Sequence, residues 1–203
     1  MKRFLFIFLC LVAVAKAQEL TGGAVSLSEA ARQSAQDSAQ RLGNEVLKSN
    51  FVYAIDQMYP RWKARQAKRI GSEAKLLKTF NRAGAQMQEA GITLDSFQAL
   101  SPLQAYRVHP KMKPGRSEIR TSADLNYQIL VFVPTKMKMS FFLENKPKVS
   151  YMRNSFQVAI SQEGSTQWSF IDGATIRITD LRSMFPLLPN DLELPVKSDV
   201  ELK

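Results

Sequence analysis

The chain has 203 residues, 45% of them hydrophobic, and 28 Lys and Arg against 18 Asp and Glu give it a net charge of +10. Its only cysteine is Cys10, which excludes an intrachain disulfide framework and a cysteine-built zinc site. The length fits one domain with a substantial core.

Residues 1–17 have the pattern of a secretory signal peptide: two cations, an apolar run over 4–15, and a small-x-small sequence ending at Ala17. The apolar run is shorter than the roughly 20 residues of a spanning helix, so we expect cleavage. An uncleaved interfacial anchor is the alternative. Cleavage would remove Lys2, Arg3 and Lys16 and lower the net charge from +10 to +7. We therefore expect a secreted or periplasmic protein without a transmembrane segment after cleavage.

The front half predicts helices. Residues 28–48 carry apolar positions at helical spacing, with Ser26 or Ser28 placed to cap the start. A second helical stretch covers 51–65, which Pro60 should kink or end near Tyr59. A third helix should follow Gly71 and Ser72 and end at Gly91. The apolar side predicted for this third helix consists of Leu76, Leu77, Phe80, Ala83, Met87 and Ala90.

The back half predicts strands, because Val, Ile, Phe, Tyr and Trp alternate there with polar residues. The expected strands are 94–100, 103–108, 125–133, 137–143, 149–160 and 167–171. We expect turns at 134–135, 144–147 and 163–166, and a loop over 109–123. Helices followed by an antiparallel meander are typical of an α+β domain. We place a single domain at 18–185 and a proline-containing extended tail at 186–203.

No catalytic residue or metal site can be assigned from motifs. The single histidine, His109, precedes a proline in the predicted loop, and no serine stands in a nucleophile elbow. The stretch 161–168 resembles the Asp-box of sialidase propellers, but it has Glu163 and Ser165 where that motif has Asp and Gly, and it occurs once. We expect no cofactor and no metal.

Two groups of residues are candidates for binding. One helical turn separates Asp56 from the tyrosines on either side of it, an arrangement that would suit proton transfer in an apolar cavity; tyrosines packed at the rim of a core are the alternative. With one tyrosine from the predicted sheet, the candidate ligand-binding residues are Tyr53, Asp56, Tyr59 and Tyr127.

The second candidate is a basic patch on the second helical stretch, made of Arg61, Lys63, Arg65, Lys68 and Arg69. Such a field attracts an anionic glycan or an envelope surface. Nucleic acid fits the charge but not the predicted export. A solvated helix face that keeps the protein soluble is the alternative.

Several short motifs in chain order resemble those of a known superfamily. They are Tyr59-Pro60, Gln86-Met87 with Gly91-Ile92-Thr93, Val133-Pro134, Ser161-Gln162-Glu163-Gly164 with Trp168-Ser169-Phe170-Ile171-Asp172, and a leucine-proline segment over 185–195. This ordered set is similar to uncharacterised secreted bacterial members of the nuclear transport factor two-like superfamily, which includes the SnoaL-like cyclases. The resemblance implies a cystatin-like cone, an α+β barrel in which N-terminal helices pack against a strongly curved antiparallel sheet.

The chain departs from that pattern at Ser49-Asn50, where the family has Gly-Asp, at Gly71, and in the loop 109–123. The resemblance supplies no catalytic residues. It favours a secreted, non-enzymatic domain that binds a ligand or partner through the cone mouth or the basic face. One alternative is a small-molecule isomerase, cyclase or dehydratase that uses an Asp/Tyr pair. The other is a structural or assembly protein of the envelope that forms a homodimer.

Overall fold

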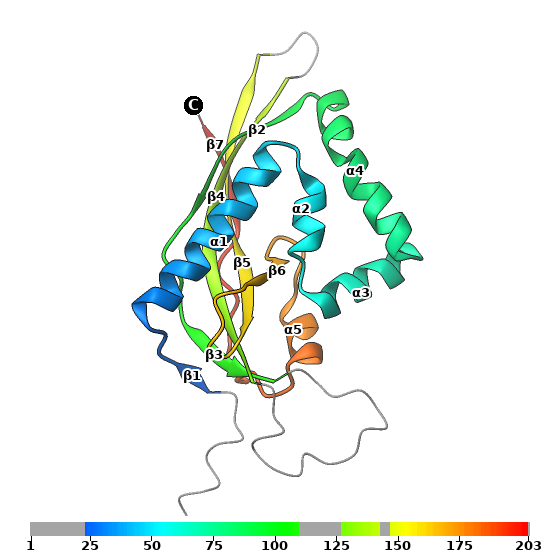
Figure 1. The fold of residues 1–203 in the computed structure, drawn as a ribbon. Coiled ribbons are helices and arrows are strands. Elements are labelled where there is room, and N and C mark those ends of the chain that lie inside the picture. Colours follow the sequence, from blue (N-terminus) through cyan, green and yellow to red (C-terminus); the bar gives the residue numbers. More distant parts are fainter. Residues whose placement is uncertain (1–22, 110–126, 143–146, 203) are drawn as a thin grey trace, which may run out of the picture.

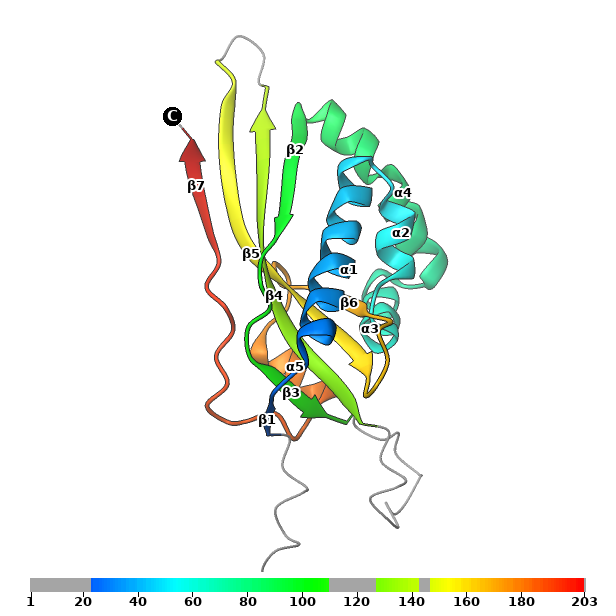
Figure 2. The same cartoon turned by 60° about the vertical axis from the view of Figure 1, so that its left-hand side comes forward.

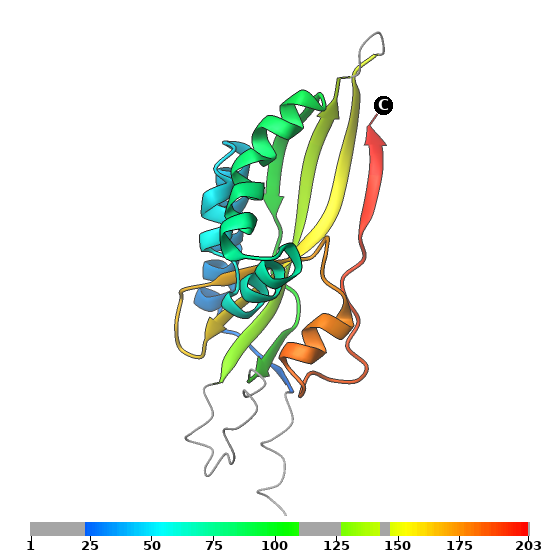
Figure 3. The same cartoon turned by 90° about the vertical axis from the view of Figure 1, so that its right-hand side faces the viewer.

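The computed structural model describes residues 23–109, 127–142 and 147–202. The predicted signal peptide and most of the predicted loop 109–123 lie outside the described residues. Most of the helices lie on one side of a long antiparallel sheet, and the last helix lies on the other side (Figures 1 and 3). The α+β class is confirmed. Neighbouring strands of the sheet come in the order β1-β3-β4-β5-β6, and the two end strands do not pair with each other. The sheet is therefore open and not a barrel.

The helix boundaries follow local signals in the sequence. Ser28 caps α1 (Glu29–Leu47) by accepting a hydrogen bond from the Ala31 amide at 3.2 Å. The predicted break at Pro60 is confirmed, since α2 (Phe51–Asp56) ends before it and Pro60 opens α3 (Pro60–Ile70).

The third predicted helix is α4 (Glu73–Glu89), which Ser72 caps. The predicted helix end at Gly91 is supported by its φ of 65°, a conformation that favours glycine. Of the predicted apolar side only Leu76 is buried, and Leu77 is 40% exposed. Phe80, Ala83 and Met87 are partly buried, so the predicted side is the covered one except at Leu77 and Ala90, which are exposed. The cover is incomplete because α4 packs mainly on α2 and α3 and less on the sheet.

Two 14-residue strands, β4 (Gln128–Phe141) and β5 (Val149–Gln162), form the hairpin at the centre of the sheet, paired in unbroken register. Two strands share the outer edge of β4, and two share that of β5. We call 128–135 with 155–162 the lower half of the hairpin, and 136–141 with 149–154 the upper half (Figure 2). The lower half is flanked by β3 (Ala105–Val108) and β6 (Ser169–Asp172). The upper half is flanked by β2 (Ile92–Ala99) and β7 (Ser198–Leu202). The short strand β1 (Ala24–Val25) extends the sheet beyond β3.

The turn predicted at 134–135 is wrong, because both residues lie inside β4. The Pro134 carbonyl accepts from the Leu100 amide at 2.8 Å, so this side of Pro134 faces the link between β2 and β3. A residue of an antiparallel strand directs its N–H and C=O to the same side. The missing N–H of Pro134 therefore faces a break in the neighbouring strand, and no ladder bond is lost.

The lower half is buried on both faces. By alternation, Val131 and Val133 face α1, while Leu130 and Phe132 face the opposite side. The core on the α1 side is built from Ala35, Ala39, Leu42, Ala99, Ala105, Val131, Val133, Ala159, Trp168 and Phe170. The core on the other side joins Trp62 of α3 to the sheet and to Leu181, Met184 and Phe185 of the C-terminal segment.

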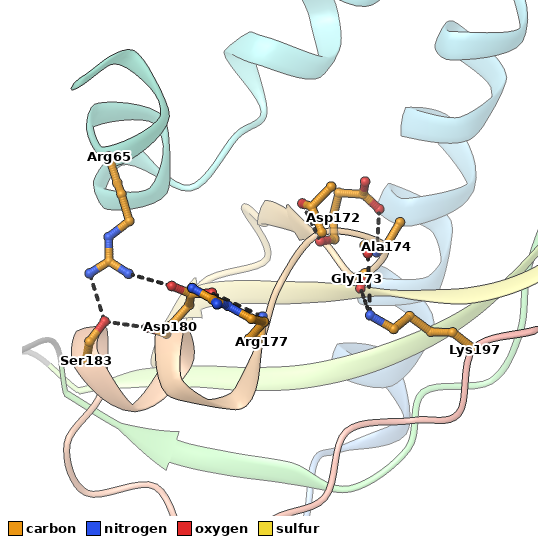
Figure 4. Close-up of polar contacts among 9 residues, drawn as sticks. Arg65, Asp172, Gly173, Ala174, Arg177, Asp180, Ser183 and Lys197 are labelled. Atoms are coloured by element: carbon orange, nitrogen blue, oxygen red, sulfur yellow. Dashed lines mark hydrogen bonds and ion pairs between the residues drawn. The ribbon is translucent and has the colours of Figure 1, made fainter. Parts of the chain in front are cut away.

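The C-terminal segment begins with α5 (Ile178–Met184), which lies inside the predicted domain. Within the predicted tail 186–203, the last described residues add β7 to the sheet. Lys197 ties the connection between them to the body by donating to the carbonyl oxygens of Gly173 and Ala174 (Figure 4). Within the described parts of the chain, no helix is both long and apolar enough to span a membrane.

Candidate functional site

Three of the four predicted ligand-binding residues line one pocket. Tyr53, Asp56 and Tyr59 face a cavity of about 760 Å³ between α1, α2, the start of α3 and the turn that joins β5 to β6. The sequence suggested that they share one helix, but Tyr59 lies beyond the end of α2. The pocket brings them together because the chain turns at 57–59, between α2 and α3.

The segment 57–59 is bonded to the sheet as an additional short parallel strand, with a bridge between Met58 and Phe170. The Tyr59 amide donates to the Phe170 carbonyl at 2.8 Å, and the Phe170 amide donates to the Gln57 carbonyl at 2.7 Å. Two walls of the pocket are thus joined by main-chain hydrogen bonds, which fix their separation.

The turn between β5 and β6 forms the third wall. Gly164 takes a φ of 80° in it, and the Ser161 hydroxyl donates to the Ser165 carbonyl at 3.0 Å. The Trp168 indole donates to Ser34 of α1 at 3.1 Å, which holds the turn against that helix. Trp168 and Phe170 pack on α1 while Ile171 faces the other core, as their alternation predicts.

Tyr59 is buried and donates a hydrogen bond to Gln128 Oε1 at 3.0 Å. Burial raises the pKa of the Tyr59 phenol, and the charge of Arg61 and the bond to Gln128 offset only part of this effect. The phenol is therefore neutral at physiological pH and acts as a donor. Gln128 also lines the pocket.

Asp56 is the one carboxylate among the lining residues, and it is exposed. Two guanidinium groups, from Arg41 of α1 and Arg61 of α3, line the same cavity, so the charges around it are positive in sum. Four side-chain amides reach it from three segments of the chain: Gln57, Gln128, and Gln162 with Gln167. Such a lining can bind a polyhydroxylated ligand that carries negative charge.

Tyr127, the fourth predicted residue, is not among the residues that line this pocket. The Arg107 guanidinium lies 3.8 Å from the centre of its ring and also binds Glu163 at 2.8 Å. The His109 ring meets Tyr127 edge-on at 6.5 Å. Tyr127 therefore packs beside the β5–β6 turn.

The predicted basic patch divides into three parts. Lys63 pairs with Glu73 of α4 at 2.8 Å, and Arg65 reaches Asp180 at 3.3 Å and Ser183 at 2.7 Å on α5 (Figure 4). Arg61 lines the pocket, as described above. Lys68 and Arg69 are exposed at the end of α3. The five residues therefore do not form one continuous surface of free cations.

A second, apolar cavity of about 490 Å³ lies on the upper half. It is lined mainly by Met139, Phe141, Val149 and Tyr151, and Arg153 stands among its lining residues in a bidentate ion pair with Asp199 of β7, at 2.8 and 2.9 Å. Both cavities contain aromatic side chains, but only the first combines them with cations and amides. We therefore take the pocket of about 760 Å³ as the candidate site.

Besides Gln57 and Pro60, which adjoin predicted residues, the pocket residues that sequence reasoning missed are Ser38, Arg41, Gln128, Ile160 and those of the β5–β6 turn. They come from segments far apart in the chain, and no local pattern marks them as neighbours. Among the described residues, no group of three His, Cys, Asp or Glu side chains is placed to hold a metal ion.

Comparison of the chain with protein-family models, curated proteins and solved structures found no match. The resemblance to the nuclear transport factor two-like superfamily thus stays a prediction from sequence motifs.

Proposed function

We propose that this protein is an exported, non-enzymatic binding domain whose pocket holds an acidic saccharide. The observation that carries the proposal is the lining of the pocket, where Arg41 and Arg61 stand among four glutamine amides and the aromatic rings of Tyr53, Tyr59 and Trp168. Its volume of about 760 Å³ lies in the usual range for a small-molecule site, roughly 300–1,000 Å³.

Each part of the lining suits a different part of such a ligand. Amides and hydroxyls exchange hydrogen bonds with sugar hydroxyls, and the half-buried ring of Tyr53 can cover an apolar face of a sugar ring. A guanidinium binds a carboxylate or sulfate in a planar, bidentate fashion, which a neutral sugar cannot use. An acidic saccharide engages all three.

The test is calorimetric titration with tetragalacturonate and, for comparison, maltotetraose, a neutral chain of the same length. We expect the acidic sugar to bind at least tenfold more tightly. Arg41→Ala and Arg61→Ala should each weaken it about tenfold, since a charged hydrogen bond contributes roughly 1.5–3 kcal/mol. Arg82→Ala, on the exposed side of α4, is the matched control. Equal affinity for the two sugars, or unchanged binding in both pocket variants, would contradict the proposal.

One observation favours the enzymatic alternative, namely that Asp56 shares the pocket with Tyr53 and Tyr59. An isomerase of this type would shift the double bond of a β,γ-unsaturated ketone into conjugation, which ultraviolet absorbance detects. Asp56→Asn separates the two functions. In a binding site for an anion it removes a repulsive charge and should raise affinity severalfold, whereas in an isomerase it should abolish turnover.

A further inference from the structure

The second surface of interest is the α3–α4 corner, which we define as the end of α3, the turn at Gly71 and the outer side of α4. Five exposed cations gather on it: Lys68, Arg69, Lys75, Lys78 and Arg82. Within the described residues, none of the five has an ion-pair partner. Glu73 is the only acid between Arg61 and Gln88, and Lys63 already neutralises it at 2.8 Å.

Helix geometry directs three of these cations outward. At 100° per residue, Lys75, Lys78 and Arg82 fall on the side of α4 opposite Leu76 and Phe80, which face α2 and α3. The figures agree, since α4 lies at the periphery of the molecule, farther from the sheet than α1 (Figures 1 and 2). A partner approaching from this side meets the cations first.

Two exposed apolar side chains belong to the same corner. Ile70 is 38% exposed and Leu77 is 40% exposed, on either side of the turn at Gly71. At 100° per residue, Leu77 lies about 100° around α4 from Lys78, and the exposed Ala74, Asn81 and Ala85 fall between them on the helix surface. A soluble polyanion would gain little from Ile70 and Leu77, whereas a bilayer can accept them.

We propose that the α3–α4 corner docks this protein on an anionic phospholipid bilayer. The cations are attracted to the headgroups, and Ile70 and Leu77 enter the boundary between headgroups and acyl chains. This proposal does not rest on the saccharide site, because the two surfaces share no residue.

Co-sedimentation of the protein with vesicles tests the proposal. We expect weak binding to pure phosphatidylcholine and strong, salt-sensitive binding to vesicles with about one third phosphatidylglycerol. Each cation near such a surface contributes about a fivefold factor, so the triple variant Lys75→Glu, Lys78→Glu, Arg82→Glu should bind at least a hundredfold more weakly. A matched triple variant on the outer side of the sheet, Lys136→Glu, Lys138→Glu, Lys148→Glu, should lose much less.

The apolar contribution is tested separately with Ile70→Ser and Leu77→Ser. Both side chains are well exposed, so these variants should fold, and together they should weaken vesicle binding about tenfold at constant charge. Two results would overturn the proposal: equal loss in the two triple variants, or unchanged binding in the serine variants, which would indicate charge attraction alone. Arg41→Ala should leave vesicle binding unchanged whether or not the pocket binds a saccharide.

Discussion

The lower and upper halves of the β4–β5 hairpin belong to the same two strands and keep the same register, yet their environments differ. In the lower half, Phe132, Phe156 and Val158 are buried in the core on the α5 side, and Val131 and Val133 in the core on the α1 side. In the upper half, Lys136 is exposed and Tyr151 is only partly covered, and the residues facing the helix side line an apolar cavity. The elements packed against a strand, more than the strand itself, decide what its alternating side chains do.

The largest expected difference is between two phenylalanines. Phe156→Ala in the lower half should cost about 3–5 kcal/mol in the free energy of unfolding, since Phe156 is fully buried and its ring meets that of Phe132 edge-on at 5.7 Å. Phe141→Ala in the upper half should cost about 1 kcal/mol, because its neighbours can close around a partly open site. Urea denaturation measures both. Equal losses would break the distinction between the halves.

A second comparison probes how α1 meets the upper half. Gly43 of α1 lies so close to β2 that an added Cβ would overlap the ring of Phe97. Phe97 in turn pairs with Met137 of the upper half. Gly43→Ala should therefore destabilise the protein by about 1–3 kcal/mol, despite the better helix propensity of alanine. In a Phe97→Ala background the same change should stabilise it. A double-mutant cycle checks this reversal, and a penalty that persists without Phe97 would show that the ring is not its cause.

The hydrogen bond between Tyr59 and Gln128 of the lower half should contribute less to the free energy of unfolding than the apolar core there. Tyr59→Phe removes the donor to Gln128 Oε1 and should cost about 1–2 kcal/mol, because the buried acceptor is left without its partner. Tyr53→Phe, at a half-buried tyrosine of the same pocket, is the control and should change stability by less. Thermal unfolding of both variants ranks them, and the reverse order would contradict the role of the Gln128 bond.

The smallest effect concerns β7 at low pH. The hydrogen bonds from Arg153 hold the pKa of Asp199 below its usual range, so this pair stabilises the folded protein above pH ~4 and the stabilisation is lost as the pH falls through the lowered pKa. Because the two side chains are 44% and 49% exposed, we expect no more than about 0.5 kcal/mol. Hydrogen exchange of the β7 amides, corrected for intrinsic rates, should show weaker protection at pH 3 than at pH 6. Asp199→Asn should remove this difference.

The sequence was most informative where a residue has a strong local preference. Ser28, Pro60 and Gly91 mark helix boundaries through their own hydrogen bonds or dihedral angles, and the structure confirms them. Pro134 also has a strong local preference, here for a turn, and for that reason it gave a wrong prediction. It lies inside β4 because its missing N–H faces a break in the neighbouring strand. The exposure of α4 was not predictable, because its periodicity reveals an apolar side but not what that side packs against.

Within the candidate site, only residues that are close in the sequence could be predicted to lie close together in space. Tyr53 and Asp56 share a helix, and their proximity follows from helical spacing. Gln128 lies 69 residues from Tyr59, and Arg41 reaches the pocket from a different helix, so their convergence depends on the tertiary fold. The division of the basic patch depended likewise on Glu73 and Asp180, which the helix pattern alone does not place.

The hydrogen bonds at two of the outer strand edges, those of β2 and β6, also bear on aggregation. On β2, Gln36 and Gln40 of α1 bond the backbone of Phe97 and Ala99, and on β6 the segment 57–59 bonds Phe170. Free strand edges are the usual starting points for fibril growth, and these contacts occupy backbone groups that an incoming chain would need. The segment that shapes the pocket thus also protects the β6 edge from association with unfolded chains.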